Sequence, residues 1–138
     1  MIAEGWHKHF SLIPSFWQIK GKDSHSVPLM TILMDSAVHC VAFSGDGSCI
    51  VSGSCDGCVQ VWDALSGVEL KVFNSHTGLV QSVAFSSNGT HIVSGSSDES
   101  VQVWDALSGV KLKVLNGHTA EIQSVAFSSD STHCLWIR

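Results

Sequence analysis

Two cysteines three residues apart, Cys55 and Cys58, form a C-x-x-C pair within the stretch SGSCDGCVQVWD. Such a pair holds zinc when two further ligands complete a tetrahedral site, and it performs redox chemistry when one thiol pKa is lowered, commonly at a helix N-terminus. The sequence has no second C-x-x-C pair and no C-x-x-C-H arrangement. We therefore interpret both cysteines as incidental thiols that flank a turn. A thiol or metal site at Cys55 and Cys58 is the remote alternative, and a disulfide across the turn under oxidation is another.

Histidines are the other residues that could bind a metal. His7 and His9 form an H-x-H pair, but a defined site needs preorganised ligands, and a solvated tail explains this pair better. The remaining histidines outside the repeat motifs discussed below show no i, i+4 pair on a predicted helix and no nearby carboxylate pattern. We expect no catalytic residue, no metal site and no cofactor.

The composition is that of one globular domain. The chain has 138 residues, a net charge of −5 and 44% apolar residues, so it is neither a disordered tail nor a basic nucleic-acid binder. Its seven lysines and arginines are spread out, and we expect no nucleic-acid partner. The longest apolar runs are too short to span a bilayer, and no secretion signal is evident. Five cysteines, an odd number, favour reduced thiols in the cytoplasm, with the nucleus as the alternative.

The strongest signal in the sequence is an internal repeat. Residues 38–77 are followed by a matching copy at 80–119, and a third copy begins at residue 122. Phe43, Phe85 and Phe127 mark the fixed period of 42 residues. Roughly two-thirds of the aligned positions are identical between the two full copies, which is typical of a repeat architecture.

Each copy contains four short runs with a period of two, which predicts β-strands and no helix. In the second copy the expected strands are 80–85, 91–96, 100–104 and 110–115. The turns between them, SSNGT, SDES and DALSG, consist mainly of residues that tolerate left-handed φ or bond their own backbone. The first three strands carry apolar or small residues on both faces, as in a sheet covered on both sides.

The fourth strand of the second copy has a different pattern. Val110, Leu112 and Val114 alternate with Lys111 and Lys113. This predicts one buried face and one wet face, with lysines that keep an outer edge from pairing with another chain. Four strands with a charged outermost member describe one blade of a β-propeller.

Short motifs recur at fixed places in the copies. The pairs Trp62-Asp63 and Trp104-Asp105 end the third strand of each copy, and Gly117-His118 precedes the third copy. Together they resemble the WD-repeat (WD40-type) family of β-propellers over about residues 34–138. The resemblance implies an all-β fold, here a partial β-propeller of two complete four-stranded blades plus a half blade. The near-identical copies are also similar to the C-terminal propellers of fungal NACHT-type immune receptors, which are thought to sense ligands.

The resemblance implies a structural hydrogen-bonded tetrad in the second blade, formed by His76, Ser94, Asp98 and Trp104. A serine, a histidine and an aspartate could also suggest a hydrolase triad. No nucleophile elbow and no glycine motif for an oxyanion hole accompany them, so we favour the structural reading.

The first copy keeps only a partial tetrad, Ser52, Asp56 and Trp62, because Met34 stands 42 residues before His76. A buried carboxylate without a partner would cost about 1–3 kcal/mol or more, so we expect Asp56 to be solvated or bonded to backbone. The third copy departs further, since Trp136 stands where the second has Ser94.

These observations divide the chain into five parts. We expect an N-terminal tail or linker at 1–26, an outer strand at 27–37, one WD-repeat blade at 38–77, a second at 78–119 and a truncated third repeat at 120–138. Family rings have four to eight blades. Three explanations stay open: the chain is a fragment of a longer propeller, it completes the propeller as a homo-oligomer, or it is a decayed copy without independent function.

The function implied by the resemblance is a non-enzymatic protein–protein interaction module that presents a loop rim to a protein or peptide partner, without nucleic acid or membrane. The two copies are identical through VQVWDALSGV but differ where rims are expected. A constant framework with a variable rim suits a binding surface. The candidate interaction rim consists of Cys55, Gly57, Gly78, Leu79, Ser97, Glu99, Ala120 and Glu121.

Overall fold

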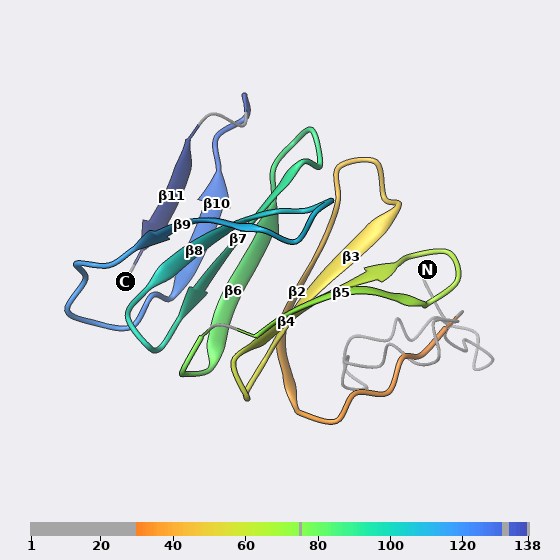
Figure 1. Ribbon diagram of the computed structural model, residues 1–138, viewed down its shortest axis with the longest axis horizontal. Helices are drawn as coiled ribbons and strands as arrows, with labels where there is room; N and C mark the ends of the chain where they lie inside the picture. The colour runs from red at the N-terminus through yellow and green to blue at the C-terminus, as the bar shows by residue number, and fades with distance from the viewer. Residues whose placement is uncertain (1–29, 75, 131–132, 138) are drawn as a thin grey trace, which may run out of the picture.

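The computed structural model describes residues 30–74, 76–130 and 133–137. Within them the chain forms antiparallel β-sheets and no helix (Figure 1). The first sheet has the order β2-β3-β4-β5 and the second β6-β7-β8-β9, while β10 and β11 form a pair. The strands are β2 (Val38–Phe43), β3 (Cys49–Ser54), β4 (Cys58–Asp63), β5 (Glu69–Asn74), β6 (Val80–Phe85), β7 (His91–Ser96), β8 (Val101–Asp105), β9 (Lys111–Leu115), β10 (Ser124–Phe127) and β11 (Cys134–Ile137).

The predicted fold is confirmed: two four-stranded blades are followed by the first two strands of a third. In the second blade, β6 and β7 have the expected bounds, and β8 and β9 begin one residue later than expected. Both blades share one register, with Ile50 opposite Trp62 in the first and Ile92 opposite Trp104 in the second. The repeat in the sequence is therefore a repeat in the structure.

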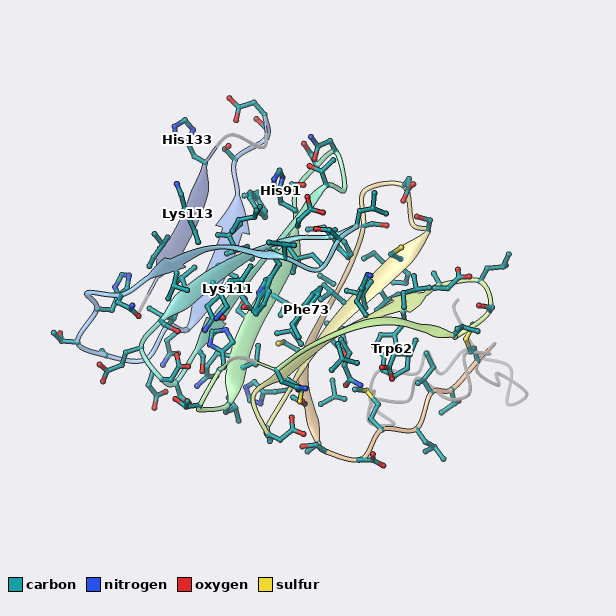
Figure 2. The ribbon with its side chains drawn as sticks, viewed as in Figure 1. Trp62, Phe73, His91, Lys111, Lys113 and His133 are labelled. Atoms are coloured by element: carbon teal, nitrogen blue, oxygen red, sulfur yellow. The ribbon has the colours of Figure 1, made fainter. Side chains whose placement is uncertain are left out.

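The blades pack face to face through their inner strands. Strand β6 lies against β2 and β3, and β10 lies against β6 and β7. The core between the two blades is closed by Phe73 on β5 (Figure 2), and its ring stacks on Trp104 with centroids 4.7 Å apart. Strands β3 and β7 are buried along nearly their whole length, as the apolar and small residues on both of their faces predicted.

A glycine near the end of β3, and another at the same place in β7, allows the blades to approach each other this closely. A Cβ added at Gly53 would lie 2.4 Å from Val80 Cγ1, and one at Gly95 would lie 2.5 Å from Ile122 Cγ2. No side chain fits at either position without moving the next blade. The SGS motif of each copy is thus a packing feature of the interface between blades.

The prediction of a buried face on the fourth strand is wrong. Val110, Leu112 and Val114 are 55%, 47% and 41% exposed. Strand β9 is the outermost strand of its sheet, and the neighbouring blade covers little of it. Lys111, expected on the wet face, instead places its Nζ 5.4 Å from the centre of the Trp104 ring, where a cation–π contact forms.

The segment before the first blade covers the outer face of that blade. Ile32 is buried and packs with Ile50 and Trp62, and Met30 and Met34 lie beside them. Of the expected outer strand 27–37, Met30 has strand geometry while residues 31–37 do not, although the Ala37 carbonyl accepts a hydrogen bond from Cys55 N over 2.9 Å. Residues 27–29 and the expected tail 1–26 lie outside the described part of the chain.

Among the described residues, no helix is long and apolar enough to cross a bilayer.

Candidate functional site

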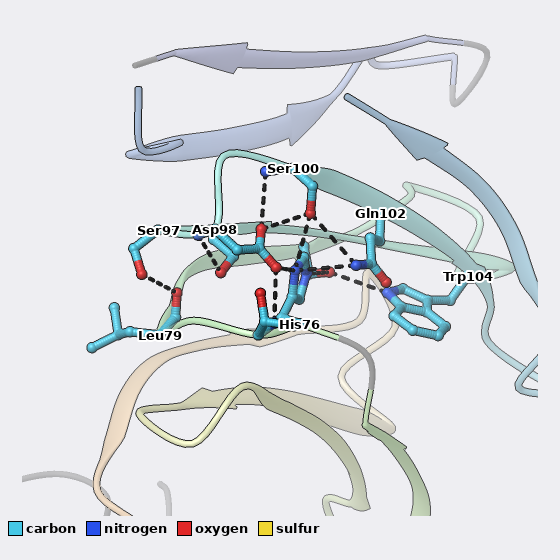
Figure 3. A network of polar contacts seen from close by, with 10 residues as sticks. His76, Leu79, Ser97, Asp98, Ser100, Gln102 and Trp104 are labelled. Atoms are coloured by element: carbon cyan, nitrogen blue, oxygen red, sulfur yellow. Dashed lines mark hydrogen bonds and ion pairs between the residues drawn. The ribbon is translucent and has the colours of Figure 1, made fainter. Parts of the chain in front are cut away.

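The second blade holds a connected network of buried polar side chains (Figure 3). The indole Nε1 of Trp104, on β8, donates to Ser94 Oγ on β7 over 3.1 Å. His76, from the β5–β6 connection, places Nε2 2.8 Å from the same Ser94 oxygen and Nδ1 3.0 Å from Asp98 Oδ2. Asp98 lies in the β7–β8 turn. The structure thus brings together all four residues of the predicted tetrad and links three chain segments through them.

Three further residues belong to this network and were missed by the sequence reasoning. Asp98 accepts hydrogen bonds from the backbone of Thr77 over 3.0 Å, and from the backbone and hydroxyl of Ser100 over 2.9 and 2.7 Å. Gln102 Nε2 lies 3.2 Å from His76 Nδ1. Its position two residues before Trp104 on β8 was the available signal, because alternate residues of a strand share a face.

Burial sets the protonation state of the histidine. Burial lowers the pKa of His76, and this outweighs the hydrogen bond and the charge of Asp98, which act in the opposite direction. Burial alone would raise the pKa of Asp98, but the hydrogen bonds from Ser100, Thr77 and His76 lower it to about 2. The network therefore pairs a neutral imidazole with a carboxylate near neutral pH.

The network is not arranged as a hydrolase triad. Ser94 is fully buried, and its oxygen already contacts both the Trp104 indole and the His76 ring. A nucleophile needs access to a substrate, and Ser94 has none. The geometry instead fits a clip that ties the β5–β6 connection and the β7–β8 turn to the sheet.

We expect acid to weaken this clip in two steps. The folded pKa of His76 lies below its unfolded value of about 6.5, so its contribution to stability is complete above that pH and is lost as the pH falls below it. The contribution of Asp98 is lost lower, between about pH 4 and its folded pKa of about 2. Urea denaturation from pH 8 to pH 4.5 should show falling stability. His76→Met, which copies Met34 of the first blade, should reduce the change of stability with pH. An unchanged pH dependence would contradict the role given to His76.

The first blade replaces the network with fewer contacts. Trp62 Nε1 donates to Ser52 Oγ over 3.0 Å, as in the second blade, but Met34 Sδ stands 4.0 Å from that oxygen in place of an imidazole. Asp56 is exposed and accepts from the backbone of Cys58 over 3.1 Å and from the Ser54 hydroxyl. The prediction that Asp56 is solvated or bonded to backbone is confirmed, since it is both exposed and bonded to Cys58 N.

The cysteine pair of the first blade has no sign of activation. Cys55 is exposed, Cys58 is half-buried, and both are free thiols. Burial and the neighbouring Asp56 carboxylate raise the pKa of Cys58 to about 11, whereas a reactive or metal-binding thiol needs a lowered one. Among the described residues, no group of three His, Cys, Asp or Glu side chains could hold a metal ion.

The candidate rim residues lie along one edge of the blades, which we call the network edge. It comprises the β3–β4 and β7–β8 turns together with the β5–β6 and β9–β10 connections (Figure 1). Backbone hydrogen bonds join these loops, for example from Ser97 N to Leu79 O over 2.9 Å. Cys55, Glu99, Ala120 and Glu121 are exposed, and Gly78, Leu79 and Ser97 are half-buried.

Gly57 was expected on the exposed rim, but the structure does not place it there. It is buried, and a Cβ added there would lie 2.4 Å from the carbonyl oxygen of His76. A partner cannot reach it, because the tight turn presses its backbone onto the β5–β6 connection. Gly57 is therefore a packing residue, and the exposed rim is formed by the other positions.

Glu99 takes the place of Gly57 in the second blade and adopts the same backbone conformation. Its φ of 73° makes it the only non-glycine residue with positive φ among those described. Glycine adopts this conformation freely, but for a glutamate it costs about 1–2 kcal/mol. The second blade thus holds an exposed carboxylate at the tip of the network edge in an unfavourable conformation.

Comparison with protein families agrees with this geometry. The family described as "WD domain, G-beta repeat" matches residues 27–63, 67–105 and 109–135, which together exceed half of the chain. The chain belongs to the WD40 family. The match at 67–105 runs from β5, the outer strand of the first blade, through β6, β7 and β8 of the second.

Individual WD40 proteins resemble the chain in part. It is 34% identical over 65 residues to the dynein assembly factor with WD repeat domains 1 of Danio rerio, which covers 47% of this chain and 14% of that protein. The solved WD40 repeats of RRP9 match with a TM-score of 0.65 and those of U3-55K with 0.66, each at 27% identity over 69% of this chain. The chain spans only about a third of either structure, 30% and 31%.

Proposed function

We propose that this WD40 chain is a non-enzymatic interaction module that binds a protein or peptide partner along its network edge. The observation that carries the proposal is Glu99. It is exposed, and it has a backbone conformation that the equivalent position of the first blade satisfies with glycine. Strained residues persist where the surrounding structure holds them and are concentrated at functional sites.

A second carboxylate of the same edge supports the proposal. Glu121 is exposed in the β9–β10 connection, and its Oε1 accepts a hydrogen bond from Gln81 Nε2 over 3.0 Å. The corresponding position 42 residues earlier is Leu79, in the β5–β6 connection. Neither acidic side chain has an acidic counterpart 42 residues earlier, which favours a partner segment with a lysine or arginine opposite Glu99 and Glu121.

The test compares the wild-type chain with variants in which each acidic residue is replaced by the residue 42 positions earlier. Random peptides displayed on phage would be selected against the wild-type chain and then measured against Glu99→Gly, Glu121→Leu and the double variant, which copy Gly57 and Leu79. We expect selected peptides to contain basic residues and to lose at least about tenfold in affinity for the double variant. The outer-strand variant Val72→Ser should bind as the wild type does. Peptides that bind all variants equally would contradict the proposal.

The wider setting of the module is part of the proposal. Because the chain spans about a third of the solved WD40 structures, we propose that it works within a larger ring, either as a fragment of a longer polypeptide or as a homo-oligomer that completes the propeller. The near-identity of its copies favours a relationship to fungal NACHT-type receptors. A cytoplasmic location, or a nuclear one, would suit its free cysteines.

A further inference from the structure

The opposite edge of the blades displays the most exposed large apolar side chains of the described residues. Leu65 and Leu107 are 89% and 85% exposed, at the tips of the β4–β5 and β8–β9 turns. Val68 and Val110, at the ends of the same turns, are 57% and 55% exposed. We call this the leucine edge: the β4–β5 and β8–β9 turns together with the β2–β3 and β6–β7 turns, which Figure 1 shows at the opposite end of the sheets from the network edge.

Neither leucine is needed for packing, yet each is held in a fixed position. The Asp63 carboxylate accepts from Leu65 N over 3.1 Å and from the Ser66 hydroxyl over 2.9 Å. Asp105 accepts from the backbone of Leu107 and Ser108 over 3.0 and 2.9 Å. Each turn is also bonded to the neighbouring hairpin of its own blade, through Ala64 N in the first and Ala106 N in the second. Both side chains are therefore displayed on ordered turns, which lowers the entropic cost of binding.

The charges of the leucine edge have one sign. Its turns and the strand ends beside them carry Asp46, Asp63 and Asp105, and no lysine or arginine occurs in these turns. Hydrogen bonds from Ser48 and Ser44 lower the pKa of Asp46 to about 2, and the bonds from Ser108 and Leu107 lower the pKa of Asp105. Lys111 follows the second turn, but its Nζ lies against the Trp104 ring. Leu65 and Leu107 are thus two exposed apolar side chains on a negatively charged surface.

We propose that the leucine edge is a second interaction surface and that it binds a basic amphipathic polypeptide segment, whose apolar side chains cover Leu65 and Leu107 in adjacent blades. Leu65 and Leu107 stand on one edge of adjacent blades, so the apolar face of one amphipathic helix can cover both while its lysines face the carboxylates. The surface is separate from the network edge and does not depend on the function proposed for it.

The test measures fluorescence anisotropy of a labelled, helix-forming synthetic peptide with leucines every three or four residues along one face and lysines around them. A matched probe carries glutamate in place of every lysine. The chain would be compared with Leu65→Ser, Leu107→Ser and the double variant. Val72→Ser with Val114→Ser is the control, since these two valines are 40% and 41% exposed on the outer strands. The serine variants should melt as the wild type does, because the leucines contact little of the protein.

We expect the double variant to bind the lysine probe at least about tenfold more weakly than the wild type, each single variant to lose less, and the valine control to stay within about twofold. Affinity for the lysine probe should also fall with added salt. Unchanged binding by the double variant, an equal loss in the valine control, or equal affinity for the glutamate probe would overturn the inference. If Glu99→Gly with Glu121→Leu abolishes binding instead, the peptide occupies the network edge, and this inference fails while the proposed function stands.

Discussion

Replacing Phe73 with alanine is expected to destabilise the chain by about 3–5 kcal/mol, the usual cost of removing a buried aromatic side chain. Phe73 is 4% exposed, and its ring stacks on Trp104 across the two blades at an interplanar angle of 10°. Its loss leaves a cavity that the two sheets cannot close without breaking the register of their hydrogen bonds. Urea denaturation followed by tryptophan fluorescence would measure the change in the free energy of unfolding.

The matched control for this prediction is Phe43→Ala. Phe43 is also a phenylalanine on a strand of the first blade, but it is 53% exposed, so its truncation should cost less than about 1.5 kcal/mol. Similar losses for the two variants would mean that the face between the blades does not hold them together. A large loss for Phe73→Ala alone would show that the blades unfold as one unit.

Asp98→Ala should destabilise the chain by about 3 kcal/mol near neutral pH. The carboxylate of Asp98 accepts from Thr77 N, Ser100 N and the Ser100 hydroxyl, and it contacts His76. Removing it leaves the buried His76 imidazole without its carboxylate partner and frees the β5–β6 connection from the turn. The same denaturation experiment would report the loss, and hydrogen exchange at Thr77 should rise with it.

The first blade supplies the control for that prediction as well. Asp56→Ala removes a carboxylate at the corresponding turn, but Asp56 is exposed and has no imidazole partner. We expect a loss of about 1 kcal/mol or less. If Asp56→Ala cost as much as Asp98→Ala, the contact with His76 would not account for the contribution of Asp98 to stability.

Much of the fold could be predicted because the repeat and its alternation are local. A strand with a period of two, bounded by Ser, Asn, Asp and Gly, specifies its own turns, so the bounds of β6 and β7 were predicted to the residue. The tetrad of the second blade could also be assigned, since it follows a family motif. Gln102 and Ser100 could not, because their part in the network depends on how closely the β5–β6 connection approaches β8.

Exposure was the property that the sequence predicted least well. The alternation of Val110, Leu112 and Val114 reads as a buried face, yet all three are exposed, whereas Phe73 on the equally outermost strand β5 is buried against Trp104. Gly57 reads as a variable rim position, yet it is buried against the His76 carbonyl. In both cases the residue type permits either environment, and the packing of the next element determines which one it has.

By itself the sequence determined the strands and turns of the two blades and the family of this protein, since each depends on residues close together in the chain. The tertiary structure alone decided which of the repeated positions are covered. Val41 and Val83 occupy the same place in the two copies, but Val41 is 40% exposed and Val83 is 7% exposed. The two valines are chemically the same, and Val83 is buried because the face of the first blade lies against it.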